Sequence, residues 1–193
     1  MKAIRAHAFG GPEVLQLEEL DDPVPGEGEV VVDVHAAGVN PADTYMLNGT
    51  YAIVPELPYI PGGDAGGVIA AVGEGVEAPS LGDRVFVGTA LSGDITGCYS
   101  EKVKRKACEV MPLPDGISFA EATAFGVSYT TAHYALFERG RAIAGETVFI
   151  HGATGSVGTS AIQLAKRAGL TVIGSGGTTN GLDLIRAVGA DPV

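Results

Sequence analysis

The feature that most constrains the fold is a glycine-rich turn between an apolar run and a helical segment. Residues 148–150 (Val-Phe-Ile) lead into residues 151–158 (His-Gly-Ala-Thr-Gly-Ser-Val-Gly). Apolar residues then recur at helical spacing through Ala165. A strand, a glycine turn and a helix in this order are the context in which a phosphate-binding turn occurs. The sequence therefore predicts a parallel α/β unit built around this turn.

The glycines of this segment are spaced for close contact between backbone and a pyrophosphate. Gly155 has no side chain, so an anion can approach its backbone, and Gly158 allows the helix to pack tightly on the strand. Free N–H groups at the helix start would face the anion. We therefore predict that Thr154, Gly155, Ser156, Val157 and Gly158 bind a cofactor. Ala153 replaces the first glycine of the usual pattern, and a tight turn without a ligand is the alternative.

The end of the next expected strand, residues 170–174, bears on the choice of cofactor. NAD-binding proteins usually place an acid there to hold the ribose 2′-hydroxyl. Here the chain continues Ser175-Gly176-Gly177-Thr178-Thr179-Asn180, and no acid appears before Asp183. An acid would repel a 2′-phosphate, so its absence favours NADPH, although no Arg or Lys replaces it. Ser175, Gly176 and Thr178 are the donors that we assign to the cofactor.

Two regions of different character follow one another along the chain. Residues 1–115 read as short strands separated by Gly and Pro, which is typical of a small antiparallel barrel or sandwich. After Gly116, Ser118 and Glu121 form a capping box, and a helical pattern continues to Glu138 with a break near Gly126. Strands at 147–151 and 170–174 then alternate with helices at 156–168 and 182–188. We predict domains at 1–115 and 116–193.

A short helix is expected to begin at Asn40. Asn is a good N-cap, Pro41 suits the first helical position, and Asp43 in the first turn complements the helix dipole. Gly49 would end the helix.

The charge and composition exclude several classes of partner. The net charge of −11 disfavours nucleic acid and anionic membrane surfaces as partners. The sequence shows neither an apolar run long enough to span a membrane nor a secretory signal, so we expect a cytoplasmic protein. Residues 102–106 (Lys-Val-Lys-Arg-Lys) are interpreted as a solvated strand face, with a phosphate site as the alternative. Cys98 and Cys108 lack the spacing of a zinc site.

Several motifs together resemble one known family. Residues 61–68 (Pro-Gly-Gly-Asp-Ala-Gly-Gly-Val), 71–76 (Ala-Val-Gly-Glu-Gly-Val) and 82–85 (Gly-Asp-Arg-Val) are similar to medium-chain dehydrogenases/reductases. Residues 40–45 (Asn-Pro-Ala-Asp-Thr-Tyr) and 151–158 resemble the quinone oxidoreductase, or zeta-crystallin-like, branch. The resemblance covers essentially the whole chain. It implies a GroES-like antiparallel β-barrel domain followed by a Rossmann domain with a doubly wound parallel sheet.

The resemblance also implies a metal-free reaction. Zinc-dependent members carry a Cys near Val39 or Asn40, a Gly-His-Glu where this chain has residues 62–64, and a cluster of four cysteines, none of which is present here. The activity implied is hydride transfer from NADPH to a quinone or an activated enone, small molecules that already have a conjugated electron sink.

Three site residues come from the resemblance alone. Asn40 and Tyr45 are implied as catalytic residues in the active-site cleft, with Asn40 also close to the cofactor, and Thr131 is implied beside the nicotinamide. The alternatives are a helix cap for Asn40, a packed aromatic for Tyr45 and an ordinary helical residue for Thr131. Asp43 is interpreted as structural.

The nucleotide-binding part is shorter than the fold requires. A doubly wound domain has about six strands, whereas the sequence indicates two, and a third would begin near residues 189–193. We therefore expect a C-terminally truncated chain that forms a homo-oligomer, most simply a dimer, through its open sheet edges. The rival hypothesis is a non-catalytic fragment that acts through self-association.

Overall fold

The computed structural model describes residues 1–88 and 95–191. The chain divides into two compact units, Met1–Gly126 and Val127–Val193. The first is built on antiparallel strands and the second on parallel strands with helices. The fold class predicted from the sequence is therefore confirmed, while the domain boundary expected after Asp115 stays a prediction.

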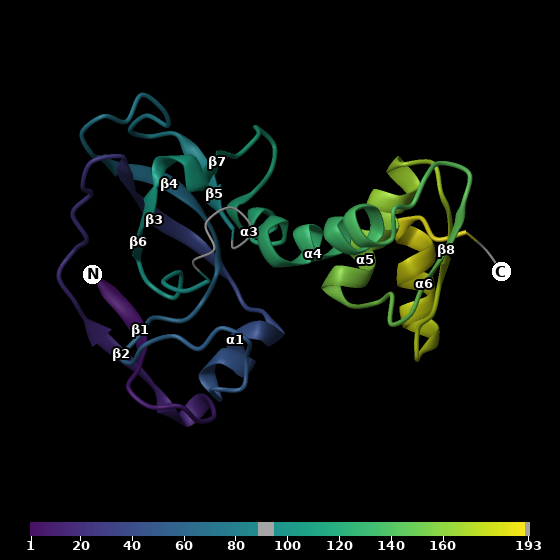
Figure 1. The fold of residues 1–193 in the computed structure, drawn as a ribbon, viewed down its shortest axis with the longest axis horizontal. Helices are drawn as coiled ribbons and strands as arrows, with labels where there is room; N and C mark the ends of the chain where they lie inside the picture. Colours follow the sequence, from purple (N-terminus) through teal and green to yellow (C-terminus); the bar gives the residue numbers. More distant parts are fainter. Residues whose placement is uncertain (89–94, 192–193) are drawn as a thin grey trace. The chain divides into compact units, whose positions relative to one another are not determined.

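The first unit is organised around a curled sheet of five antiparallel strands in the order β6-β3-β4-β5-β7 (Figure 1). Its strands are β3 (Glu29–Gly38), β4 (Asp64–Val72), β5 (Arg84–Val87), β6 (Lys102–Lys106) and β7 (Val110–Pro112). β-Branched residues fill its interior because such side chains pack well on a pleated surface. The core contains Val30, Val32, Ala65, Ile69, Val85, Val87, Cys98, Val103 and Val110.

A hairpin and a short helix form a second part of this unit. β1 (Lys2–Ala6) and β2 (Leu15–Glu19) pair antiparallel across the 3₁₀ turn Pro12–Val14. β1 makes isolated bridges from Ala3 to Ser100 and from Ala6 to Tyr59. The helix α1 (Pro41–Leu47) buries Leu47 in a small cluster with Ala6 and Tyr59. It begins after Asn40, as the sequence predicts.

The basic run 102–106 forms strand β6, with its side chains alternating between two faces. Lys102 pairs with Asp22 and Asp33, and Lys104 pairs with Glu29. The lysines thus lie on a solvated face, as predicted. Arg105 departs from that interpretation, because it is buried and donates hydrogen bonds to the carbonyls of Lys104 and Thr96. Strand alternation places it beside Val103 on the inner side.

A helical segment runs across the boundary between the two units. It begins with α3 (Phe119–Ala122), whose N-cap is Ser118. The Ser118 N–H donates to the Glu121 carboxylate at 2.8 Å, and the Glu121 N–H donates back to the Ser118 hydroxyl at 3.1 Å, so the predicted capping box is confirmed. The expected break near Gly126 is a π-helical turn, Phe125–Tyr129. α4 (Thr130–His133) and a second π-helical turn, Tyr134–Arg139, complete the segment.

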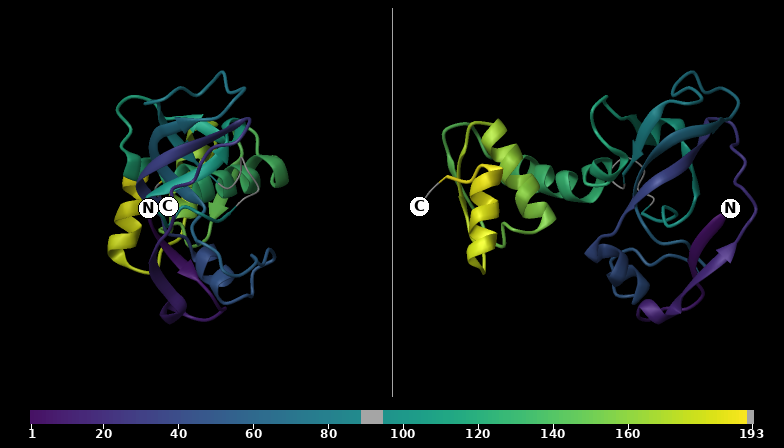
Figure 2. Two further views of the ribbon diagram at one scale, coloured as in Figure 1. Left: turned by 90° about the vertical axis from the view of Figure 1, so that its left-hand side faces the viewer. Right: turned by 180° about the vertical axis from the view of Figure 1, so that it is seen from behind.

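The second unit contains the predicted parallel α/β arrangement. β8 (Thr147–Ile150) pairs in parallel with β9 (Thr171–Gly174), and α5 (Ser156–Arg167) connects them. The helix α6 (Thr179–Val188) follows β9. The helix α5 packs against both strands and against α6, and the right-hand view of Figure 2 shows the two helices side by side. Ile162, Leu170, Val172 and Ile185 lie in its core.

The end of the chain differs from the sequence prediction in the start of α6. α6 begins at Thr179 rather than Leu182, because the Thr178 hydroxyl accepts the Gly181 N–H at 3.1 Å and caps the helix. The third strand was expected near residues 189–193, of which Pro192 and Val193 lie outside the described residues.

None of the described helices combines the length and the apolar character needed to cross a membrane.

Candidate functional site

In the first unit, Asn40 is held by two buried carboxylates. Its backbone N–H donates to Asp43 Oδ2 at 2.8 Å, which ties the N-cap to the first turn of α1. Its side-chain amide nitrogen donates to Asp64 Oδ2 at 2.9 Å. All three residues are more than nine-tenths buried. Asn40 therefore occupies the N-cap position of α1, and its side-chain amide is fixed by Asp64. Its catalytic role stays a prediction.

Asp43 has a second partner that comes from a distant part of the chain. The Tyr99 hydroxyl donates to Asp43 Oδ2 at 2.9 Å. Burial raises the pKa of Asp43, while the hydrogen bonds from Asn40 and Tyr99 act in the opposite direction. Burial and the bond to Asp43 also raise the pKa of Tyr99, so this hydroxyl remains a donor. The structural role predicted for Asp43 agrees with this geometry.

Asp64 occupies a space that glycine leaves open. It is the first residue of β4 and has no exposed surface. A Cβ atom on Gly126 would lie 1.8 Å from Asp64 Oδ1, so a larger residue there would displace the carboxylate. Because Gly126 has no side chain, the carboxylate of Asp64 can lie against the π-helical turn.

Tyr45 differs from the buried groups around it. It lies on α1 but is 51% exposed, and no hydrogen bond of its hydroxyl is found among the described residues. Successive buried residues of the helix, Met46 and Leu47, carry the packing instead. The alternative of a packed aromatic is therefore not supported, and the hydroxyl is available to a ligand.

In the second unit, the glycine turn has the two properties predicted from its spacing. A Cβ on Gly155 would meet nothing nearer than the Gly152 carbonyl oxygen at 3.7 Å, so its backbone faces open space. A Cβ on Gly158 would lie 2.6 Å from Ala153 Cα, so this glycine is needed for packing of α5. Gly155 is the N-cap of α5 and supplies no side-chain cap. The first N–H groups of this twelve-residue helix thus remain available to an anion.

The loops after β8 and β9 are joined by hydrogen bonds. The Ser175 N–H donates to the Ile150 carbonyl at 3.0 Å, and the Ala153 N–H donates to the Ser175 carbonyl at 2.9 Å. The Gly152 N–H donates to the Ser175 hydroxyl oxygen at 3.2 Å. The structure therefore brings the predicted residue Ser175 next to the glycine turn at the carboxyl ends of both strands.

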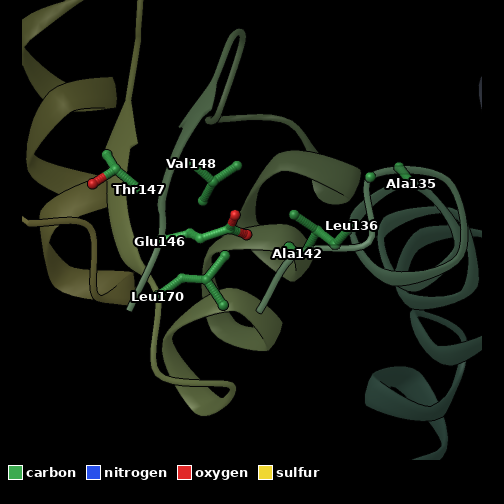
Figure 3. A pocket seen from close by; sticks show the side chains of 8 residues that line it. Ala135, Leu136, Ala142, Glu146, Thr147, Val148 and Leu170 are labelled. Atoms are coloured by element: carbon green, nitrogen blue, oxygen red, sulfur yellow. The ribbon is translucent and has the colours of Figure 1, made fainter. Parts of the chain in front are cut away.

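The hollow drawn in Figure 3 lies elsewhere in this unit. It has a volume of about 420 Å³ and is lined by residues around the amino end of β8, among them Glu146, Thr147 and Leu170. Ligands of open α/β sheets bind at the carboxyl ends of the strands. This hollow is consequently not the nucleotide site that the glycine turn indicates.

Comparison with known proteins identifies the family. The model of the alcohol dehydrogenase GroES-like domain matches residues 26–143. The chain belongs to this family. It is 44% identical over its whole length to a quinone oxidoreductase of Rattus norvegicus, of which it covers 58%. The chain thus spans about three-fifths of the length of this relative.

Solved structures give a consistent result. The quinone oxidoreductase of Escherichia coli, crystallised with NADPH, is 36% identical, with a TM-score of 0.88 over 98% of this chain and 57% of its own. An NAD-dependent alcohol dehydrogenase is 32% identical, with a TM-score of 0.92 over 99% of this chain and 62% of its own. The resemblance to quinone oxidoreductases of the medium-chain dehydrogenase/reductase superfamily is confirmed.

The site residues that were predicted from the sequence lie in both units. In the first unit, Asn40 precedes α1 and Tyr45 lies within it. In the second unit, the predicted cofactor residues lie together at the carboxyl ends of β8 and β9: Thr154, Gly155, Ser156, Val157, Gly158, Ser175, Gly176 and Thr178. Thr131 is exposed on α4. Its role beside a nicotinamide stays a prediction.

Sequence reasoning missed Tyr99 and the contact of Asp64 with Asn40. Tyr99 belongs to no motif, and 56 residues separate it from Asp43. Asp64 was noted in the motif at residues 61–68 and among the residues in place of zinc ligands, but its contact with Asn40 was not predicted. Within residues 1–88 and 95–191, no three His, Cys, Asp or Glu side chains are grouped so that they could hold a metal ion.

Proposed function

We propose that this chain carries the nucleotide-binding turn and the substrate-binding groups of an NADPH-dependent quinone or enone oxidoreductase that works without a metal. The observation that carries the proposal is the open space at Gly155, the N-cap of α5, where a Cβ atom would meet nothing nearer than the Gly152 carbonyl oxygen at 3.7 Å. The similarity to quinone oxidoreductases over the whole chain supports the same activity.

The second unit supplies the cofactor site in this proposal. The backbone of Thr154, Gly155, Ser156, Val157 and Gly158 binds the pyrophosphate at the positive end of the α5 dipole. Ser175, Gly176 and Thr178 bind the adenosine ribose and its 2′-phosphate. The Thr178 hydroxyl accepts the Gly181 N–H and keeps its own proton to donate.

The first unit supplies groups for the substrate. Bound NADPH provides the hydride. The exposed Tyr45 hydroxyl donates a hydrogen bond to the carbonyl oxygen of the quinone or enone, where negative charge develops as the double bonds are reduced. The amide of Asn40 is a second polar group, fixed by Asp64. By resemblance, we also assign Asn40 and Thr131 to the cofactor.

A steady-state assay of NADPH oxidation with a para-quinone tests this proposal. The chain should oxidise NADPH only when the quinone is present, and Tyr45→Phe should lower kcat/KM by about tenfold, which corresponds to one hydrogen bond to developing charge. No quinone-dependent oxidation, together with no binding of NADPH, would contradict the function.

An exposed strand supports the alternative function, self-association without catalysis. Phe149 on β8 is 62% exposed, and within the described residues β8 and β9 pair only with each other. An open strand edge with an exposed aromatic residue favours pairing with another chain. Light scattering that detects dimers or larger assemblies of a chain lacking NADPH binding would favour this alternative; a monomer that reduces quinones would exclude it.

A further inference from the structure

Ser175 has a neighbour that decides what its hydroxyl can offer. The Ser175 oxygen accepts the Gly152 N–H at 3.2 Å, and it lies 3.1 Å from Nδ1 of His151. His151 is exposed at the end of β8, and Ser175 follows β9. These contacts lie at the carboxyl ends of the two strands, beside the glycine turn. His151 therefore contacts a residue that the proposed function assigns to the cofactor.

A serine hydroxyl has one proton and two acceptor positions, so the state of Nδ1 determines the role that remains. When Nδ1 lacks a proton, Ser175 donates its proton to Nδ1, and the hydroxyl can only accept from a ligand. When Nδ1 carries a proton, it donates to Ser175. Both acceptor positions are then used, by His151 and by Gly152, and the serine proton is free to donate.

The two nicotinamide cofactors make different demands on this hydroxyl. A ribose 2′-hydroxyl can donate or accept, whereas an ionised 2′-phosphate only accepts. We propose that His151 is a specificity-determining residue, which favours a 2′-phosphate by donating from Nδ1 to Ser175 and so releasing the serine proton toward the ligand. The proposal rests on the proposed NADPH site and names the residue that tunes its selectivity.

His151 has few other contacts among the described residues. Within the described part of the chain His151 forms no ion pair, and its other described contact is with the ring of Phe149, at 6.5 Å between centroids. Three charged groups on the neighbouring elements have partners of their own: Glu146 accepts the Ile143 N–H, Lys166 pairs with Asp191, and Arg186 pairs with Asp183.

Calorimetric titration of the chain with 2′,5′-ADP and with 5′-ADP tests this assignment. We expect the preference for 2′,5′-ADP, the ratio of the two Kd values at one fixed pH, to be about fivefold larger in the unaltered chain than in a variant that cannot donate to Ser175, which corresponds to one net hydrogen bond.

Three variants test the contact between His151 and Ser175. His151→Phe cannot donate to Ser175, so the preference for 2′,5′-ADP should fall by about fivefold. His151→Asn has an amide that can donate to Ser175, so the preference should be retained. In Ser175→Ala, the hydroxyl is absent and the preference should fall as in His151→Phe. An unchanged preference in Ser175→Ala would overturn the route through serine, and an unchanged preference in His151→Phe would overturn the role of His151. Failure of 5′-ADP itself to bind would instead contradict the proposed cofactor site, and the inference with it.

Discussion

At the scale of single residues, the glycine turn shows that identical residues in one motif have different physical roles. Gly155 faces open space, whereas Gly158 touches the backbone of Ala153. In the proposed cofactor site, a side chain at Gly155 would take the space assigned to the pyrophosphate, whereas one at Gly158 would separate α5 from the turn. Binding and packing can therefore be tested independently.

We predict that Gly155→Val abolishes nucleotide binding without unfolding the second unit. The new side chain enters open space, and its cost as an N-cap residue is about 1 kcal/mol. Gly158→Val is the matched control, because overpacking against Ala153 should lower stability by about 1–3 kcal/mol. Calorimetry with NADPH and thermal unfolding measure the two effects. Unchanged affinity in Gly155→Val would show that the turn is only structural.

We also predict that Ser175→Asp shifts the cofactor preference toward NADH. A carboxylate at this position can still accept the Gly152 N–H, but it repels a 2′-phosphate. The ratio of the NADH and NADPH dissociation constants should change by at least about tenfold, or 1.4 kcal/mol. Ser175→Asn has a similar size and no charge, so an equal change in that variant would exclude repulsion as the cause.

At the scale of elements, local signals predicted most of the fold. The Ser118–Glu121 capping box, the start of α1 at Asn40 and the order β8, α5, β9, α6 all follow from short-range patterns. Long-range contacts were not accessible in this way. Nothing in the sequence around Tyr99 indicates that its hydroxyl reaches Asp43, because that contact depends on how the sheet and α1 pack.

The carboxyl of Asp43 should leave a signature in the pH dependence of stability. Burial raises its pKa in the folded state, so folding favours the protonated form. The stability due to this group is fully present below the unfolded pKa of about 3.9 and is lost as the pH rises through the raised folded value.

Asp43→Asn keeps an oxygen that can accept from Asn40 and Tyr99 but cannot ionise. The free energy of unfolding of the unaltered chain, minus that of the variant, should therefore fall as the pH rises from about 4. Denaturant unfolding at a series of pH values measures this difference. A difference that grows with pH would mean that hydrogen bonding, rather than burial, dominates the pKa of Asp43.

At the scale of the whole molecule, the two units offer different side chains, and residues 1–88 and 95–191 contain no group of three His, Cys, Asp or Glu side chains that could hold a metal ion. The first unit offers Asn40, held by Asp43 and Asp64, and the exposed Tyr45, while the second offers the glycine turn with Ser175. The zinc ligands of related dehydrogenases are absent from the sequence. Reduction of a quinone does not require a Lewis acid, because the conjugated ring accepts the electrons.

We therefore predict that the activity is independent of metal. The purified chain should contain zinc well below one ion per chain, and a chelator should leave quinone-dependent oxidation of NADPH unchanged. Stoichiometric zinc together with loss of activity on chelation, restored by added zinc, would contradict this prediction.

The central claim is that the turn after β8 binds the pyrophosphate of NADPH and that the end of β9 tolerates its 2′-phosphate. Parallel calorimetric titrations of the unaltered chain with NADPH and with NADH test it most directly. The account predicts saturable binding of one NADPH per chain, tighter than NADH and lost in Gly155→Val. Tighter binding of NADH, or NADPH binding that persists unchanged in Gly155→Val, would contradict it.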